Sequence, residues 1–363
     1  MLSFAQEAAR WSARKRAVFD QINGAGLPVV LFGSKACVIS PDFLEELQVP
    51  HEYILDNDAK KWGSTQWGLR VISPTSVPYR DYQVLILVPA FVEEITEQLR
   101  GFPNPPRQIF DLDLYYESSD SAAYYDAHSG DIEEVMGLLS DPLSKETFQR
   151  VLHYRVNRDR SCLSPVVLPR GEQYFPAIEI NSRPFLHNQE VFVDAGAYTG
   201  DTVSAFRQAV GGRYRAIYAF EPDAGNFALL SEACAGMPGV MCIQAGVGER
   251  EEMAAFNPAG PGSKVGAEGM EQIRIVALDE HLMGEGREAV TYLKMDVEGM
   301  EGAALLGAKR LIQTCRPKLA VCTYHSDADM LELPKLMHRL NPEYRLYFRH
   351  YTCGVQETVC YAV

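Results

Sequence analysis

The chain contains 363 residues, of which 47% are hydrophobic and 23% are charged, a composition typical of a globular protein. Its length exceeds that of one ordinary hydrophobic core and predicts two domains. The formal net charge of -14 disfavours nucleic acid as a partner, because nucleic-acid-binding proteins usually present a basic face. No apolar run approaches the roughly 18 residues that span a bilayer, and the N-terminal stretch lacks the apolar centre of a signal peptide. We therefore expect a cytoplasmic protein with no membrane partner.

Strand-like and helix-like segments alternate in residues 1–105. The N-terminal stretch predicts an amphipathic helix, with one face formed by Phe4, Ala8, Trp11, Arg14, Val18 and Ile22. Apolar runs follow in "LPVVLFGSKA", "HEYILDND" and "YQVLILVPA", and they predict a small Rossmann-like α/β domain with a parallel sheet. Residues 106–188 are interpreted as a mainly helical connector that begins in the linker-like stretch "GFPNPPRQIFDLD".

Strand-like runs return from Val191 onward, and residues 189–363 are predicted to form the main domain. In an open parallel sheet the ligand binds beyond the carboxyl ends of the strands, where successive loops converge. The residues that close these runs are therefore the candidate site residues, namely Asp194, Glu221, Gly246, Asp296 and His325.

The loop after the first of these runs contains two glycines. Gly196 lets the chain turn and approach a ligand closely, and Gly200 opens the next helix. A dinucleotide-binding loop would have the pattern G-x-G-x-x-G and would present bare backbone amides to a pyrophosphate. Here Tyr198 adds bulk and Asp194 adds a negative charge, so the loop favours a cationic ligand over a pyrophosphate.

A second carboxylate, Glu221, closes the next run. An acid at this point of a doubly wound sheet can bind a ribose diol through charge-assisted hydrogen bonds. S-adenosylmethionine combines an adenosine with a cationic end, so it fits both carboxylates. Taken singly, Asp194 could cap the following helix and Glu221 could be a solvated strand end, but together with the loop they favour this cofactor.

Four segments resemble the signature blocks of the FkbM-type methyltransferases, namely "VDAGAYTGDT", "AFEP", "YLKMDVEGMEGAALLGA" and "RPKLAVCTYH". The resemblance implies a class I S-adenosylmethionine-dependent enzyme with a seven-stranded, mostly parallel sheet and an antiparallel C-terminal strand. Together with the strand ends, it predicts a cofactor site formed by Asp194, Gly196, Ala197, Tyr198, Thr199, Gly200, Asp201, Thr202, Glu221, Pro222, Gly246, Val247 and Asp296. One departure is Tyr324, where the family more usually has a glutamate.

Asp296 and His325 are the predicted catalytic residues. Methyl transfer to a hydroxyl requires alignment of the acceptor and removal of its proton. Asp296 is expected beside the sulfonium, and His325 is expected to be the general base because imidazole titrates near neutral pH. Alternatively, His325 caps its strand and Asp296 accepts hydrogen bonds from the turn at Gly299. Asp296, Glu298 and His325 could also hold a divalent cation, but spacing alone does not establish this, and no metal site is predicted.

Two weaker signals lie outside these blocks. In the N-terminal domain, Gly33 stands in a turn and Asp56 stands at the end of the next strand. This domain could bind a nucleotide or nucleotide-sugar, or it could be a scaffold for assembly, for example into a homo-oligomer, and the scaffold is slightly favoured. In the connector, Tyr174 and Phe175 could cover the pocket or could simply be packed.

The sequence therefore predicts an S-adenosylmethionine-dependent O-methyltransferase whose acceptor is a sugar, another polyhydroxylated small molecule or a glycan. The hydroxyl acceptor follows from the resemblance, and the sugar follows from the N-terminal signal. Two alternatives are a non-catalytic module that binds S-adenosylmethionine or a nucleotide, and a nucleotide-dependent oxidoreductase. The first loop argues against the oxidoreductase, and the joint presence of both predicted catalytic residues with Asp194 and Glu221 argues against the non-catalytic module.

Overall fold

The computed structural model describes residues 3–34, 41–88, 91–112, 118–176, 179–180, 183–257, 264–265, 271–284 and 288–363. The chain divides into two compact units. The first comprises Met1–His128, Gln149–Pro165 and Thr352–Val355, and the second comprises Ser129–Phe148, Val166–Tyr351 and Gln356–Val363. The predicted connector at 106–188 is therefore shared between the two units.

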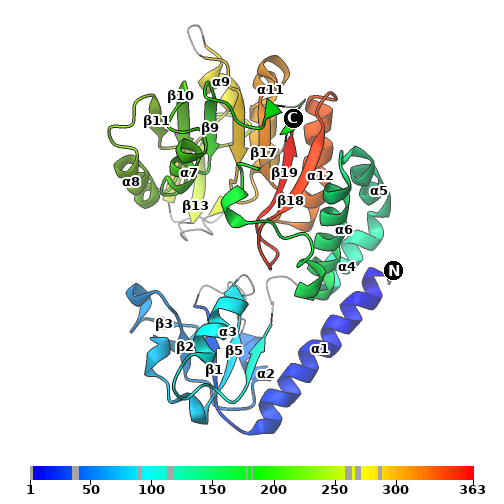
Figure 1. Cartoon of the computed structure of the whole chain (residues 1–363), viewed down its shortest axis with the longest axis vertical. Helices are drawn as coiled ribbons and strands as arrows, with labels where there is room; N and C mark the ends of the chain where they lie inside the picture. Colours follow the sequence, from blue (N-terminus) through cyan, green and yellow to red (C-terminus); the bar gives the residue numbers. More distant parts are fainter. Residues whose placement is uncertain are drawn as a thin grey trace. The chain divides into compact units, whose positions relative to one another are not determined.

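A six-stranded sheet lies at the centre of the first unit (Figure 1). The strand order is β3 (Thr65–Gln66), β4 (Leu69–Ile72), β2 (Tyr53–Leu55), β1 (Val29–Phe32), β5 (Gln83–Ile86) and β6 (Ile109–Asp111). All pairings are parallel except that between β3 and β4. Strand β6 comes from the stretch that was interpreted as a linker, and its pairing with β5 shows that this stretch belongs to the sheet.

Helix α1 (Phe4–Ala25) matches the predicted amphipathic helix, and it buries Ala8, Trp11, Phe19 and Ile22. A capping box at Ser3 and Gln6 starts the helix, and Gly26 ends it in the left-handed conformation. The other helices of this unit are α2 (Pro41–Glu46), α3 (Val92–Arg100) and α4 (Ser118–Ala127). Helix α1 packs against α4, and Glu7 in α1 is 2.7 Å from Nδ1 of His153, which explains why Gln149–Pro165 joins the first unit.

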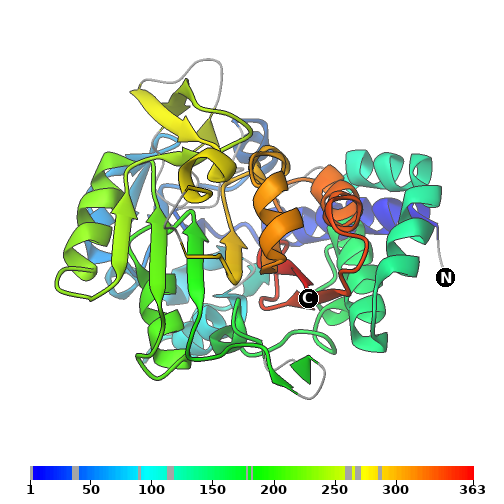
Figure 2. The same ribbon diagram turned by 90° about the horizontal axis from the view of Figure 1, so that it is seen from above.

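A seven-stranded sheet lies at the centre of the second unit, and Figure 2 shows its strands in a row from green to red. Its order is β11 (Val240–Ile243), β10 (Ala216–Phe220), β9 (Val191–Ala195), β16 (Tyr292–Met295), β17 (Lys318–Cys322), β19 (Thr358–Ala362) and β18 (Leu346–His350). Strand β19 runs antiparallel to both of its neighbours, whereas the other pairings are parallel. The predicted mixed α/β class is confirmed.

Helices and two small sheets complete the second unit. The helices are α5 (Ser129–Leu138), α7 (Asp201–Ala209), α8 (Ala224–Ala233), α9 (Leu278–Leu282), α10 (Glu301–Gly307), α11 (Lys309–Cys315) and α12 (Asp327–Leu340), while α6 (Pro142–Asn157) contains residues of both units. One small sheet has the order β12 (Gly246–Val247), β15 (Glu271–Val276), β13 (Glu252–Asn257) and β14 (Lys264–Val265). The other pairs β7 (Glu179–Ile180) with β8 (Arg183–Pro184).

The core of the second unit determines which way the site residues face. Phe192 in β9 and Tyr292 in β16 pack together with Phe206 of α7 in one buried cluster. Because side chains alternate along a strand, Asp194 and Lys294 point to the same face as these aromatic residues. The sheet thus directs a carboxylate and an ammonium into its own core.

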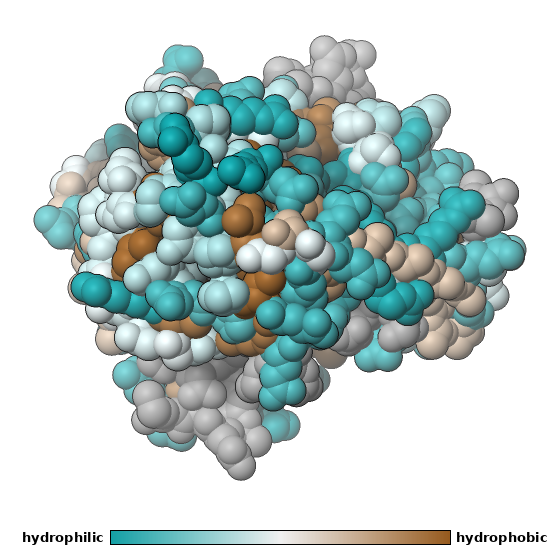
Figure 3. Space-filling view, turned by 90° about the horizontal axis from the view of Figure 1, so that it is seen from below, coloured by the Kyte–Doolittle hydropathy of each residue, from teal (hydrophilic) through white to brown (hydrophobic). Residues whose placement is uncertain are grey.

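Among the described residues, no helix is both long and apolar enough to cross a membrane. On the face drawn in Figure 3, the coloured hydrophobic residues form small patches separated by hydrophilic ones.

Candidate functional site

The loop at Gly196 is attached to both neighbouring strands. The N–H groups of Gly196 and Ala197 donate to the carbonyl oxygen of Phe220 in β10, at 3.0 and 2.9 Å. On the other side, Nζ of Lys294 in β16 donates to the Gly196 carbonyl at 2.7 Å. Gly196 has φ +83°, and a Cβ atom there would lie 1.8 Å from the carbonyl oxygen of Asp296. The close approach of two backbones therefore requires glycine at this position.

Glu221 lies beside this loop, directly after β10, and only 6% of the residue is exposed. One carboxylate oxygen accepts the N–H of Tyr198 at 2.9 Å, and the other accepts the N–H of Asp223 at 2.9 Å. Burial raises the pKa of Glu221, and these backbone hydrogen bonds oppose the shift. The side chain of Asn226 also hydrogen-bonds this carboxylate, and since a carboxylate has about four acceptor positions, one remains available to a hydroxyl.

Asp194 does not face an open space for a ligand. It is fully buried, and one of its oxygens is 3.0 Å from Nζ of Lys294, its register partner in β16. Burial raises the pKa of Asp194 to about 6, although Lys294 opposes the shift. For Lys294, burial acts to lower the pKa, but Asp194 and Asp296 raise it overall. The carboxylate predicted to attract a cationic ligand is therefore balanced by a lysine within the chain.

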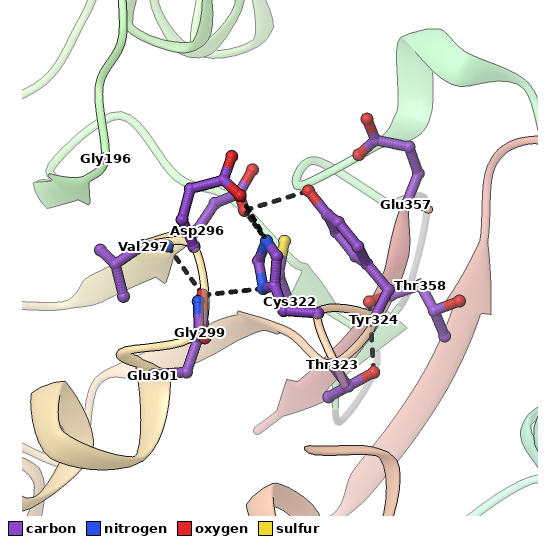
Figure 4. Close-up of polar contacts among 12 residues, drawn as sticks. Gly196, Asp296, Val297, Gly299, Glu301, Cys322, Thr323, Tyr324, Glu357 and Thr358 are labelled. Carbon is purple, nitrogen blue, oxygen red and sulfur yellow. Dashed lines mark hydrogen bonds and ion pairs between the residues drawn. The ribbon is translucent and has the colours of Figure 1, made fainter. Parts of the chain in front are cut away.

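Asp296 follows β16 and accepts two tyrosine hydroxyls. Tyr174 donates to Oδ2 at 2.9 Å, and Tyr324 donates to Oδ1 at 3.1 Å. Figure 4 shows the Tyr324 hydroxyl pointing at Asp296 from the segment after β17. Tyr174 is held in turn, because its N–H donates to the Tyr361 hydroxyl at 2.9 Å and its carbonyl accepts the hydroxyl of Tyr292. The predicted site residue Asp296 thus lies at the centre of a polar cluster.

His325 lies in the same cluster, and its side chain is only 5% exposed. Its Nε2 is 3.4 Å from Oδ1 of Asp296 and 3.5 Å from Oε2 of Glu298, whereas its Nδ1 is 3.2 Å from Oε1 of Glu301. Glu301 is fully buried at the start of α10, and it also accepts the N–H groups of Val297 at 2.7 Å and Gly299 at 3.0 Å. One imidazole therefore has carboxylates at both of its nitrogens.

These contacts set the charge of the cluster. Burial would lower the pKa of His325, but the interactions with Asp296 and Glu301 raise it to about 11. For Asp296, burial acts to raise the pKa, but His325 and Lys294 hold it well below the usual range. In this arrangement the imidazole is protonated near neutral pH and is a hydrogen-bond donor. A role for His325 as the general base requires the loss of that proton and stays a prediction.

Four non-glycine residues around the cluster have positive φ angles. They are Tyr174 at 65°, Tyr198 at 48°, Glu298 at 55° and Glu357 at 63°. Side chains with a Cβ rarely adopt this conformation, and such strain concentrates at functional sites. Glu357 accepts a hydrogen bond from Gln173, which is next to Tyr174. Burial raises the pKa of Glu357.

The remaining predicted cofactor residues lie around the same sheet edge. Gly200 has φ +88° and is the N-cap of α7, which begins with Asp201 and Thr202. Gly246 and Val247 form β12 of the four-stranded sheet instead of closing β11. A Cβ atom on Gly246 would lie 3.7 Å from Cβ of Pro222, so this segment is still beside the end of β10. Thr199 lies between Tyr198 and Gly200 in the first loop.

Sequence reasoning gave no role to Lys294 or Glu357, and it treated Tyr324 only as a departure from the family pattern. Lys294 could have been suspected, since it is the one cation within "YLKMDVEG". Tyr174 had been considered only as a cover for the pocket, whereas its hydroxyl binds Asp296. Phe175 is packed against Phe192, Phe206 and Tyr292 and is part of the core.

The N-terminal candidates form a separate polar group within the first unit. Gly33 has φ +114°, and the carboxylate of Asp56 accepts the N–H and hydroxyl of Ser34. It also accepts Nζ of Lys61 at 2.7 Å and the N–H of Asp58 at 2.8 Å. Burial would raise the pKa of Asp56, but the hydrogen bond from Lys61 lowers it overall. Hydrogen-bond donors within the chain thus satisfy the carboxylate of Asp56. Residues 35–40, which follow Ser34, lie outside the described residues.

Part of the chain matches a family model, and the chain is similar to solved structures. Residues 194–352 match the family model of the methyltransferase FkbM domain. Methyltransferase FkbM from Methylobacillus flagellatus KT has the same fold, with a TM-score of 0.64 and 20% identity over 93% of this chain and 90% of that one.

Two other structures are similar over less of this chain. An rRNA methylase from Streptococcus thermophilus has a TM-score of 0.33 and 13% identity over 49% of this chain and 87% of that one. Fibrillarin from Aeropyrum pernix, in complex with S-adenosyl-L-methionine, has a TM-score of 0.33 and 14% identity over 49% and 69%. No curated protein matched the chain. The family match confirms the resemblance predicted from the sequence: residues 194–352 form a methyltransferase FkbM domain.

Proposed function

We propose that the second unit binds S-adenosylmethionine and methylates a hydroxyl of a sugar or another polyhydroxylated molecule. Methylation with this cofactor is implied by the family of residues 194–352. The observation that carries the cofactor assignment is the position of Glu221, which is held by two backbone N–H groups beside the Gly196 loop.

The residues around that loop suit the cofactor. Glu221 would bind the ribose hydroxyls, and the loop from Gly196 to Gly200 would pass close to the rest of the nucleoside. Asp296 would lie beyond the end of β16, beside the sulfonium. Asp194 contributes indirectly, since it balances the lysine that binds the Gly196 carbonyl.

When bound, S-adenosylmethionine would supply the methyl group as its S–C bond breaks to leave a neutral thioether, and the proton of the acceptor hydroxyl would pass to a base or to solvent. The chain must align the acceptor and exclude water. Tyr174 and Tyr324, both mostly buried, fix the carboxylate of Asp296 by donating hydrogen bonds to it. The hydroxyl acceptor rests on the family resemblance, and the sugar rests on the weaker N-terminal signal.

Calorimetric titration with S-adenosylmethionine tests the cofactor assignment. Glu221→Gln keeps the shape of the side chain but removes its charge, so charge-assisted bonds worth about 1.5 to 3 kcal/mol are lost and Kd should rise roughly 10- to 150-fold. Glu232→Gln is the matched control, because Glu232 is an exposed acid in α8 of the same unit. Equal Kd values for wild type and Glu221→Gln would remove Glu221 from the site, and no binding by the wild type would overturn the proposed function.

A further inference from the structure

The cluster after β16 and β17 contains a mixed set of metal-ligand groups. Asp296, Glu301 and His325 each offer a ligand atom within 4.8 Å of the others. None of the three is exposed: Glu301 is fully buried, and the His325 side chain is 5% exposed. Exposed acids often cluster without a ligand, but here a nearly buried imidazole is included.

The two nitrogens of His325 have different surroundings. Nδ1 faces Glu301, whose position is fixed by the N–H groups of Val297 and Gly299. Nε2 faces Asp296 at 3.4 Å and Glu298 at 3.5 Å. In metal sites, a ligating histidine usually donates its other N–H to a carboxylate, which fixes the tautomer and orients the ring. Glu301 is in that position relative to Nε2.

The ligand atoms around Nε2 lie slightly farther apart than an octahedral ion requires. Two ligands that are each about 2.1 Å from one octahedral ion lie about 3.0 Å apart at a right angle, so the separations of 3.4 and 3.5 Å would shorten by about half an ångström when the ion binds. The Asp296 oxygen nearest Nε2 accepts only the Tyr324 hydroxyl among the hydrogen bonds described, and a carboxylate oxygen has a second acceptor position. A small movement of the Glu298 side chain, which is 30% exposed, would complete the set.

Charge balance points the same way. Three carboxylates surround the single imidazole, and uncompensated negative charge is costly in a partly buried site. Lys294 offsets Asp296 only in part, because it is also 3.0 Å from the buried carboxylate of Asp194. A divalent ion would compensate the excess charge directly.

We propose that Asp296, Glu298 and Nε2 of His325 bind a divalent cation of the Mg²⁺ or Mn²⁺ class, that the ion displaces the Nε2 proton, and that Glu301 accepts the Nδ1–H and orients the imidazole. Carboxylate oxygens suit these hard ions, and Mn²⁺ also accepts imidazole. The ion would bind the acceptor hydroxyl and lower its pKa, so that the hydroxyl proton could pass to solvent water without a dedicated general base. This role rests on the proposed function, whereas binding of the ion does not.

Mn²⁺ is the probe, and binding is measured on the chelator-treated full chain without S-adenosylmethionine. Loss of the free Mn²⁺ electron-spin-resonance signal should show one ion per chain, and spin-echo modulation should show an imidazole nitrogen bound to it. Glu298→Gln and His325→Ala should each weaken binding at least 10-fold, and His325→Ala should abolish the nitrogen modulation. Glu301→Gln should weaken binding 10- to 100-fold, the usual effect of losing such a partner.

Glu357→Gln is the matched control, because Glu357 adds negative charge near Asp296 but does not contact His325 in the described structure. It should change the Kd for Mn²⁺ less than 3-fold. Absence of Mn²⁺ binding by the folded wild type would overturn the proposal. So would an equal effect of Glu357→Gln and Glu298→Gln, which would indicate general electrostatic attraction. Because Kd values for S-adenosylmethionine are measured separately, failure of the metal site is distinguishable from failure of the proposed function.

Discussion

Gly196→Ala should destabilise the second unit more than an alanine at any open left-handed glycine. Its φ of +83° alone costs an L residue roughly 1–2 kcal/mol. In addition, the new Cβ would lie 1.8 Å from the Asp296 carbonyl oxygen. Because that oxygen belongs to the backbone, the strand end must move, and overpacking of this kind costs about 1–3 kcal/mol. The sum is about 2–5 kcal/mol, a large fraction of a typical unfolding free energy of about 5–15 kcal/mol.

Gly236→Ala provides the matched control. Gly236 has φ +76°, and no atom lies within 4 Å of the position that its Cβ would take. Only the conformational cost of about 1–2 kcal/mol is therefore expected. The difference between the two variants isolates the contact with Asp296.

Urea unfolding of the full chain measures both variants. The three tryptophans, Trp11, Trp62 and Trp67, all lie in the first unit, so their fluorescence reports on that unit. Far-ultraviolet circular dichroism reports on both units. Gly196→Ala should lower the urea midpoint of the unfolding transition seen by circular dichroism, while the transition seen by tryptophan fluorescence should stay at the wild-type midpoint. If Gly196→Ala were no more destabilising than Gly236→Ala, the close backbone approach at Gly196 would be wrong.

Two further predictions concern the connector and an ion pair. Limited proteolysis should cut first between Pro103 and Arg107, because this loop is mostly exposed. The segment Ser118–Gly130 should be cut later, because helices α4 and α5 protect its backbone. Early fragments identified by mass spectrometry as cut inside β5 would contradict this prediction. Burial would raise the pKa of Asp141, but the hydrogen bond from Arg349 at 2.6 Å lowers it overall. Asp141→Asn should thus cost about 1–3 kcal/mol at pH 7, less than a fully buried pair because the Asp141 side chain is 29% exposed. The difference in unfolding free energy between wild type and Asp141→Asn should narrow below pH 3.8, the ordinary pKa of this carboxyl, because Asp141 then becomes protonated first in the unfolded and then in the folded state. A difference that stays constant with pH would contradict the ion pair with Arg349.

Short sequence patterns predicted those candidate residues that stand in a turn or at the end of a strand. Gly196 and Gly200 were recognised because a chain that leaves a buried strand and turns sharply needs residues that tolerate positive φ. Glu221 was predicted because an acid at the end of the second strand can bind a ribose diol, and this role stays a prediction. The positive φ angles of the two glycines are local, whereas the approach of Gly196 to Asp296 and the hydrogen bond from Tyr198 to Glu221 join distant parts of the chain.

The partners of the site residues could not be predicted in this way. Asp194 and Lys294 are far apart in sequence, and they meet only because β9 and β16 pair in a register that places them opposite each other. Similarly, Tyr174 reaches Asp296 from the connector, and Tyr324 reaches it from the end of β17. The charge of His325 depends on these long-range placements, so an imidazole expected to titrate near neutral pH is instead held protonated by neighbouring carboxylates.

Strand β16 supports both the Gly196 loop and the acid cluster at Asp296. The Gly196 loop lies against the backbone of Asp296, and Lys294 in the same strand binds the Gly196 carbonyl. Any displacement of the β16 end therefore moves both the loop beside Glu221 and the carboxylate that faces His325. An ion that draws Asp296 toward His325 should consequently change the affinity of the Gly196 loop for S-adenosylmethionine. Likewise, a substitution at Gly196 should weaken binding of the proposed ion, although Gly196 contacts none of the side chains proposed to bind it. Binding at the two sites is expected to be coupled through β16, and by linkage the coupling must be equal in both directions.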